Sequence, residues 1–475
     1  MPDKDFQGYW WIPGTNPEAK VPGVLTIEHS GRSELALIGG FHGEPAAEMR
    51  GGVLIDPGAE QLREVPLIIG TATDGTEITL AESLVVQSGR NHQLVRVGRV
   101  LEGVHLERSD AEDFKSARVR IENLDVWTNF LAFARPDLPD CTDPTARLLP
   151  QDPVEFTDGG FQFRLRPVVR PFGYDLTRSG IDVVSHSLLV LEIEPAKPIA
   201  CDAFDEVVSS WVDLVSFATG ESCAITSFRL VHREPKVLRV PRHSVQEDGT
   251  TKRDIETLQF DRDVIMRAHW NKVPDDSPGR ALNQRNFTIA AGDRPLDQWY
   301  AAWMHLRRRA KNALDILLSL TYGNNTFLQS DLLVVALGAE TLHRDLWPGC
   351  LGTYPRDFAL MIETAVKGLD EDDAAWIRGA LRNEPSYAQR LRDLASIPAQ
   401  SAVEFAIPDV EAWAQRLATS RNGLAHGLRT NDVQVEEMYN LMKRTRLLLE
   451  LVVMQEIGVS VQDQTNYAVE HQVTG

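Results

Sequence analysis

The sequence of 475 residues contains few cysteines and no paired cysteine motif. Its four cysteines, Cys141, Cys201, Cys223 and Cys350, are widely spaced, and none belongs to a Cys-x-x-Cys pair. Neither a disulfide framework nor a cysteine zinc site is therefore expected, and a reducing cytoplasm is the expected compartment.

Long hydrophobic runs are also missing. The most apolar stretch, residues 447–454, contains Glu450 and is much shorter than the about 20 apolar residues that span a bilayer. The first residues, MPDKDFQGYWW, carry charge early and do not form the apolar segment of a signal peptide. We therefore expect a soluble, cytoplasmic protein with no membrane partner.

Three common catalytic motifs do not occur in the sequence. There is no Gly-x-x-x-x-Gly-Lys-Ser/Thr phosphate loop, no His-Glu-x-x-His zinc motif and no Gly-x-Ser-x-Gly elbow. The acidic run of residues 370–373 precedes a helical pattern, where acids are expected because the N-terminus of a helix is partly positive. We therefore expect neither a metal nor a cofactor.

The charge balance is acidic. The chain has 49 Lys and Arg against 68 Asp and Glu, which gives a formal net charge of −19. This balance disfavours a protein that coats nucleic acid by charge alone, since phosphates repel an acidic surface. A local basic site remains open, because net charge does not say where the charges lie. The length predicts about two to four domains.

The first part of the sequence is typical of antiparallel β structure. Hydrophobic residues alternate with polar ones, as in a half-buried strand, at Phe161, Phe163 and Leu165. The pair Asp74-Gly75 lies between two apolar segments and predicts a β-hairpin with a tight primed turn.

One helical period interrupts this part. Apolar residues recur at three- and four-residue steps over residues 204–215, which predicts a helix that packs on the sheet. We expect residues 1–285 to form a mainly antiparallel β region, either as one lobe or as two that divide at the turn-rich residues 136–153.

The period becomes helical beyond residue 286. Amphipathic helices are expected at residues 299–317, at 328–342, from about 370, at 410–426 and at 433–457. The polar tail after Ser460 is expected to fray. The predicted fold class is therefore an α+β multidomain protein, in which the β-rich region of residues 1–285 precedes an all-α bundle of residues 286–475.

One short segment carries side chains suited to chemistry. Arg421, Asn422 and His426 lie at the end of the fourth predicted helix, just before Gly427, which is expected to stop it. Asn422 and His426 are four residues apart and share a face opposite the buried stripe. Taken alone, the pattern favours an ordinary helix C-terminus whose histidine interacts with the helix dipole.

A family resemblance changes this interpretation. The segment RNGLAHG, residues 421–427, resembles the catalytic motif of Apea-like HEPN domains in bacterial anti-phage proteins. The segment LLVVALGAETLHR, with Glu340 inside an apolar helix, resembles the second helix of that family. The resemblance covers about residues 296–460. It implies an ApeA-type β-rich N-terminal region that detects infection or restrains the nuclease.

The resemblance implies a metal-independent endoribonuclease. RNA supplies its own nucleophile, the 2′-OH, so the enzyme needs a base, an acid and a fixed cation. His426 is suited to proton transfer, Arg421 to holding phosphate oxygens, and Asn422 to orienting either group. A single motif has one histidine, and HEPN nucleases bring two motifs together by dimerising. Glu340 is expected to form a structural ion pair with an arginine of a neighbouring helix, with Arg421 as the candidate, and direct proton transfer is the less favoured alternative.

A basic cluster on the first helix offers a second, weaker prediction. Arg307, Arg308 and Lys311 belong to the most basic stretch of this acidic chain, and such a face is a candidate track for RNA phosphates. The alternative is a solvated helix surface that pairs with nearby acids.

The resulting functional hypothesis is an RNase of anti-phage defence that acts by abortive infection. Its expected partners are an RNA substrate, a second copy of the chain in a homodimer or higher oligomer, and a phage-derived trigger. The rival hypothesis is a non-catalytic HEPN dimerisation module that carries a ligand- or protein-binding β domain.

Overall fold

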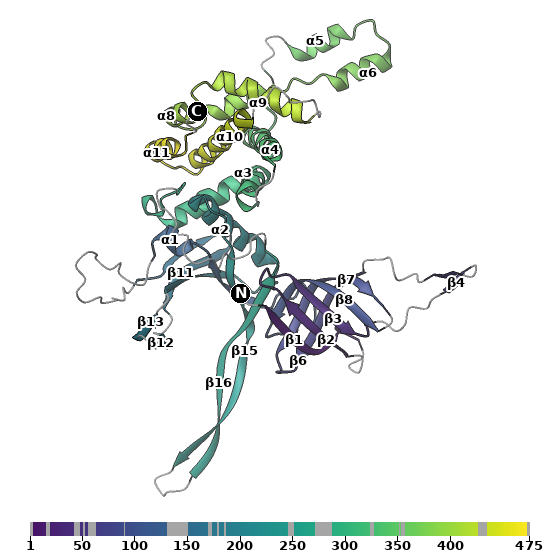
Figure 1. Cartoon of the computed structure of the whole chain (residues 1–475), viewed down its shortest axis with the longest axis vertical. Helices are drawn as coiled ribbons and strands as arrows, with labels where there is room; N and C mark the ends of the chain where they lie inside the picture. Colours follow the sequence, from purple (N-terminus) through teal and green to yellow (C-terminus); the bar gives the residue numbers. More distant parts are fainter. Residues whose placement is uncertain are drawn as a thin grey trace, which may run out of the picture. The chain divides into compact units, whose positions relative to one another are not determined.

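The structure is a computed structural model. It describes residues 3–15, 20–41, 48–50, 53–55, 63–89, 91–130, 151–169, 173–177, 180–184, 187–245, 251–270, 287–323, 327–350, 352, 357–425 and 435–472. The chain forms two compact units, Met1–Val215 with Cys223–Ala281, and Ser216–Ser222 with Leu282–Gly475 (Figure 1). We call them the β unit and the helical unit. The predicted fold class, a β-rich region followed by a helical one, is confirmed.

A closed antiparallel barrel forms the first part of the β unit (Figure 1). Its strands are β1 (Lys4–Trp11), β2 (Val21–Ile27), β3 (Ser33–Ile38), β6 (Arg63–Ala72), β7 (Glu77–Ser88) and β8 (His92–Glu102). The order β8-β3-β2-β1-β6-β7 closes because β7 also pairs with β8. Closure leaves these strands without the unpaired edge of an open sheet. The short strands β4 (Glu48–Arg50) and β5 (Val53–Ile55) pair with each other.

The barrel is filled by alternate side chains of each strand. In β1, Phe6 and Trp10 are buried, and the Trp10 side chain is fully enclosed. Gly70 of β6 lies against that indole, where an added Cβ atom would be 2.1 Å from Trp10 Cε3. The size of the tryptophan therefore requires a glycine at this position.

Strands β6 and β7 form the predicted hairpin, but its turn is not of the primed type. The Gly75 N–H donates to the Ala72 carbonyl at 2.9 Å, so Thr73 and Asp74 are the central residues of the turn. Gly75 follows them with a left-handed φ of 84°. A primed turn needs positive φ at a central residue, whereas here the glycine closes a longer loop.

A second layer continues the sheet from the barrel. It contains β9 (Phe114–Ile121), β10 (Val154–Asp158), β11 (Phe161–Val169), β14 (Ser187–Pro195), β15 (Ile225–Val245) and β16 (Thr251–Ala268), and joins the barrel where β16 pairs with β8. The chain leaves the barrel in the loop of residues 103–113, earlier than the division expected at residues 136–153. Most of that stretch, residues 131–150, lies outside the described residues.

Smaller elements complete the β unit. They are helix α1 (Leu124–Thr128) and the paired strands β12 (Gly173–Thr177) and β13 (Gly180–Val184). The predicted helix is present as α2 (Ala203–Thr219). Its Trp211 is fully buried, with its ring centroid 5.8 Å from that of Phe163 and 6.1 Å from that of Phe156. The apolar face of α2 thus covers the inner face of the second layer.

The helical unit contains more helices than the five expected. The described residues include α3 (Leu296–Tyr322), α4 (Leu328–Leu346), α5 (Phe358–Ala365), α6 (Glu371–Ala380), α7 (Tyr387–Ala395), α8 (Gln400–Ala406), α9 (Val410–Ala425), α10 (Val435–Glu456) and α11 (Val461–His471). Helices α5, α7 and α8 are too short for a repeating apolar stripe. The acidic run begins α6 as predicted, since Asp370 accepts the Asp373 N–H at 2.9 Å.

Helix α10 lies at the centre of the bundle, with an apolar run from Leu447 to Met454 that is buried apart from the half-buried Glu450. The expectation of a frayed tail after Ser460 was wrong, because α11 packs on α10. The Tyr467 hydroxyl donates to Glu450 at 3.0 Å, and the buried Gln464 amide donates to Val459 O at 2.9 Å. Polar contacts fix this helix, so an apolar pattern does not reveal it.

Within the described ranges, no helix is both long enough and apolar enough to cross a membrane.

Candidate active site

The motif of the fourth predicted helix lies in the last turns of α9. Asp409 caps the start of this helix by accepting the Ala412 N–H at 2.9 Å. Trp413 and Leu417 are buried, and the Trp413 indole N–H donates to Thr445 of α10 at 3.2 Å. These contacts fix the rotation of α9 and direct Asn422 toward solvent.

His426 lies outside the described residues, as does Gly427. The described part of the motif is therefore Arg421 and Asn422. The expected role of His426 stays a prediction.

The Arg421 guanidinium is held by three neighbours. Its Nη2 donates to Glu340 Oε2 of α4 at 3.0 Å, and its Nη1 donates to Asn422 Oδ1 at 3.2 Å. Its Cζ lies 5.4 Å from the centroid of the Tyr387 ring, in cation–π range. The side chain stays 36% exposed. Because a guanidinium has five N–H donors, this arrangement orients Arg421 and still leaves donors for an anion.

Tyr387 provides the surface on which Arg421 packs. It begins α7, and its hydroxyl donates to the Ala336 carbonyl of α4 at 2.9 Å. Burial raises the pKa of Tyr387, so the phenol remains neutral over the physiological range. The ring is thus fixed between α4 and α7, beneath the end of α9.

Glu340 binds two arginines at once. Its Oε2 accepts from Arg421, and its Oε1 accepts from Arg344, one turn later on α4, also at 3.0 Å. Arg344 in turn contacts Glu384 at 3.3 Å, and Glu384 accepts from Arg390 at 3.1 Å. With Arg382, which lies 3.8 Å from Glu384, four guanidinium groups face two carboxylates, so the cluster keeps a net positive charge although Arg421 is paired.

Sequence reasoning found Glu340 but gave no role to Arg344 or Tyr387. The i, i+4 spacing of Glu340 and Arg344 was a usable signal, because such residues are neighbours on a helix. No pattern in the sequence indicated Tyr387, which comes from a helix too short to show a period.

A second histidine near this cluster is structural. His343 is fully buried and packs against Trp347 with the two rings tilted by 48° and their centroids 4.8 Å apart. Arg390 donates to its Nδ1 at 3.0 Å, so Nε2 carries the proton and donates to Asp393 at 3.0 Å. Burial lowers the pKa of His343, which keeps the ring neutral.

The expected basic track on α3 loses one of its members. Arg307 is 6% exposed, and its Nη1 lies 3.8 Å from Asp315 Oδ1. The backbone departs from helical geometry at Ala310, with φ −136° and ψ 38°. Arg307 lies on the buried apolar stripe of α3, between Trp303 and Ala310, and therefore not on a solvent face with Lys311.

The other two basic residues remain accessible. Arg308 is exposed, and Lys311 is 53% exposed with an ion pair to Asp315 at 2.5 Å. Within the described ranges, no group of three or more His, Cys, Asp or Glu is placed to hold a metal ion.

Two family models match the chain. Residues 5–236 match ApeA N-terminal domain 1, and residues 333–463 match the Apea-like HEPN domain. These two matches confirm the predicted resemblance to the Apea-like HEPN family. The HEPN match includes Glu340, Arg421 and Asn422, and the ApeA N-terminal match includes the barrel and most of the second layer. HEPN domains are generally ribonuclease folds, and they typically dimerise and bind RNA.

Neither the curated proteins nor the solved structures provide a significant match to the chain.

Proposed function

We propose that this protein is a metal-independent endoribonuclease of anti-phage defence that cleaves RNA at a site built from Arg421, Asn422 and His426. The observation that carries the proposal is the half-exposed Arg421 guanidinium, held by Glu340 and by the Tyr387 ring at the end of α9. A cation fixed in this way is suited to the charge that develops on a phosphate during its cleavage.

The proposed reaction is an internal transesterification. The 2′-OH loses its proton to a base and attacks the adjacent phosphorus, while the bond to the 5′-oxygen breaks and that oxygen takes a proton from an acid. The products are a 2′,3′-cyclic phosphate and a free 5′-OH. His426 serves as the proton-transfer group, because the unperturbed pKa of histidine is near 6.5.

Arg421 would bind the non-bridging phosphate oxygens through the N–H groups that Glu340 and Asn422 do not use. Arg344 supports this role, because it shares the Glu340 carboxylate and so offsets its negative charge. Glu340 acts here as a positioning residue that does not touch the substrate.

One histidine cannot act as base and acid in the same step. We therefore place two copies of the motif, one from each subunit of a homodimer, on either side of the scissile phosphate. One His426 takes the 2′-OH proton and the other protonates the 5′-oxygen.

The biological role that follows is abortive infection in the cytoplasm. The ApeA N-terminal domain would respond to a phage-derived trigger, and the released nuclease would damage RNA before phage matures. An acidic chain with a net charge of −19 has low basal affinity for RNA, which favours restraint in the uninfected cell.

The test is digestion of RNA by the full-length protein in EDTA, with and without lysate from phage-infected cells. We expect fragments that end in 2′,3′-cyclic phosphate and that are not made by the His426→Ala variant. Arg416→Ala is the matched control, because Arg416 is on the same helix, 65% exposed and 3.8 Å from Glu437. A stable dimer that leaves every RNA intact under both conditions would support the non-catalytic module instead.

A further inference from the structure

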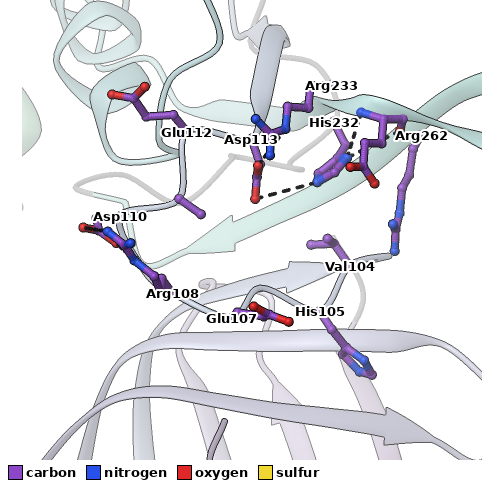
Figure 2. A pocket seen from close by; sticks show the side chains of 12 residues that line it. Val104, His105, Glu107, Arg108, Asp110, Glu112, Asp113, His232, Arg233 and Arg262 are labelled. Carbon is purple, nitrogen blue, oxygen red and sulfur yellow. Dashed lines mark hydrogen bonds and ion pairs between the residues drawn. The ribbon is translucent and has the colours of Figure 1, made fainter. Parts of the chain in front are cut away.

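The β unit contains a polar cavity of about 640 Å³ that the proposed nuclease activity does not use (Figure 2). Its walls are the loop of residues 103–113, the residues 232–234 of β15, and Arg262 of β16. The volume is within the range of about 300–1,000 Å³ that is usual for ligand sites.

The loop wall of the cavity is fixed to the barrel. Thr79 Oγ1 donates to the Val104 carbonyl at 2.8 Å and accepts the Leu106 N–H at 3.0 Å. The His105 ring is 2.7 Å from the Gly70 carbonyl through its Nε2. The loop therefore has its position before any ligand binds.

A β-bulge forms the opposite wall. The register between β15 and β16 shifts between His232 and Lys236, so that residues 233–235 of β15 lie opposite the single residue Asp261. Bulges redirect side chains and are frequent beside binding sites. Here the bulge directs the Arg233 side chain toward Asp113, and the two form an ion pair at 2.9 Å (Figure 2).

His232 is a buried donor directed into this cavity. It is 6% exposed, and the Glu234 N–H donates to its Nδ1 at 3.1 Å. The Glu234 carbonyl is farther from Nδ1, at 3.4 Å, so the shorter contact with the N–H assigns Nδ1 as the acceptor and places the ring proton on Nε2. That nitrogen is 4.0 Å from Asp113 Oδ2, beyond hydrogen-bonding distance (Figure 2). A ligand with an acceptor, such as a carbonyl oxygen, would satisfy it.

The charges around the cavity are not balanced. Each of its arginines has an acidic partner, which is Asp110 for Arg108, Asp113 for Arg233 and Glu77 for Arg262. Three exposed glutamates also line it, and the described residues include no ion-pair partner for them: Glu107, Glu112 and Glu234. The cavity therefore favours a cationic ligand and disfavours phosphate.

We propose that this cavity binds an extended basic segment of a partner protein. The backbone carbonyl of the segment accepts from His232 Nε2, and its Lys or Arg side chains contact the three glutamates. A polyamine would match the negative charge but has no acceptor for the histidine. Binding of this segment does not depend on RNA cleavage, and it gives the N-terminal domain a ligand of defined chemistry.

The test measures binding of labelled probes to the full-length protein by fluorescence anisotropy at low and moderate salt. The probes are the hexapeptide Gly-Lys-Arg-Lys-Arg-Gly, its counterpart with Glu in place of each basic residue, and spermidine as a competitor. We expect the basic peptide to bind, the acidic peptide not to bind, and spermidine to compete only weakly.

The variants locate the site. One variant changes three glutamates to Gln: Glu107, Glu112 and Glu234. We expect its affinity for the basic peptide to fall about 10-fold. The matched control changes three exposed glutamates of the same unit to Gln: Glu64, Glu194 and Glu206. It removes the same charge, so we expect it to leave the affinity within about 2-fold.

His232→Phe removes the buried donor. We expect the affinity for the basic peptide to fall about 5- to 10-fold and the affinity for spermidine to stay unchanged. A thermal unfolding curve checks that His232→Phe folds. If it does not fold, the triple glutamate variant still tests the site, because its three side chains are exposed. The proposal is overturned if the basic peptide does not bind, if both triple variants weaken it equally, or if spermidine competes as well as the peptide.

Discussion

Helices α9 and α3 of the helical unit both carry arginines that sequence reasoning selected, yet the structure treats them differently. Arg421 of α9 is 36% exposed and packs against Glu340 and Tyr387. Arg307 of α3 is 6% exposed and lies beside a kink at Ala310. Exposure together with fixed orientation distinguishes a candidate catalytic cation from a buried structural one.

The difference comes from neighbours that are distant in sequence. Glu340 and Tyr387 reach Arg421 from α4 and α7, and they hold it without covering it. On α3, Arg307 lies on the buried apolar stripe, between Trp303 and Ala310. A run of basic letters in a sequence therefore does not define a binding face until the helix geometry is known.

The largest effect is expected at Arg421. Arg421→Ala should lower the rate of RNA cleavage about 100- to 1,000-fold, the range seen when one fixed donor to a developing anion is removed. Single-turnover cleavage with saturating RNA measures this rate. Arg421→Lys should also be strongly impaired, because an ammonium lacks the planar fork of a guanidinium. Full activity in Arg421→Ala would show that Arg421 of α9 is not a catalytic cation and does not differ in this respect from Arg307 of α3.

Glu340→Gln tests the positioning of Arg421. The amide keeps the shape of the carboxylate but loses its charge, so we expect kcat to fall about 10-fold while KM changes little. Glu436→Gln, an exposed residue of α10, is the control. An unchanged kcat together with a lower unfolding temperature would show that Glu340 has a structural role alone.

Arg307→Ala should affect stability and leave catalysis unchanged. Loss of the buried side chain removes packing around α3, and we expect the free energy of unfolding to fall by about 1–2 kcal/mol. Urea denaturation followed by circular dichroism measures this change. Reduced RNA affinity in the folded variant would show that Arg307 does contribute to RNA binding on α3.

Arg308→Ala sharpens the comparison on α3 itself, because Arg308 is exposed and its neighbour is not. If Arg308 contacts a phosphate, RNA affinity should fall about 2- to 3-fold, and the slope of log affinity against log salt should decrease by about one. Binding to the inactive His426→Ala protein isolates this effect. An unchanged salt slope would mean that α3 is a solvated surface.

The smallest expected effect concerns pH and His343. Because burial lowers its pKa below the ordinary 6.5, the unfolded chain binds more protons than the folded one as pH falls. The stability that the neutral ring contributes is therefore present above pH 6.5 and is lost as pH falls through the lowered pKa. Unfolding temperatures between pH 5 and 7.5 should decrease more steeply for the wild type than for His343→Gln, and equal slopes would contradict this.

Much of the fold was predictable because its signals are local. The alternation at Phe163 and Leu165 in β11 and the stripe of Trp413 and Leu417 in α9 depend on neighbours within a few residues. Helix α11 was missed because its buried Gln464 and Tyr467 are fixed by hydrogen bonds that an apolar pattern does not show. Closure of the barrel depends on pairing between β7 and β8 and on the order of all its strands, which no single segment encodes.

The sequence by itself determined the succession of β-rich and helical regions and the motif around Arg421, because periodicity and a short motif are properties of adjacent residues. Only the tertiary structure decided that Glu340, Arg344 and Tyr387 surround Arg421, that Arg307 is buried, and that His232 faces a cavity. These facts depend on which distant side chains the packed helices and strands bring within a few ångströms, and on how much water they exclude.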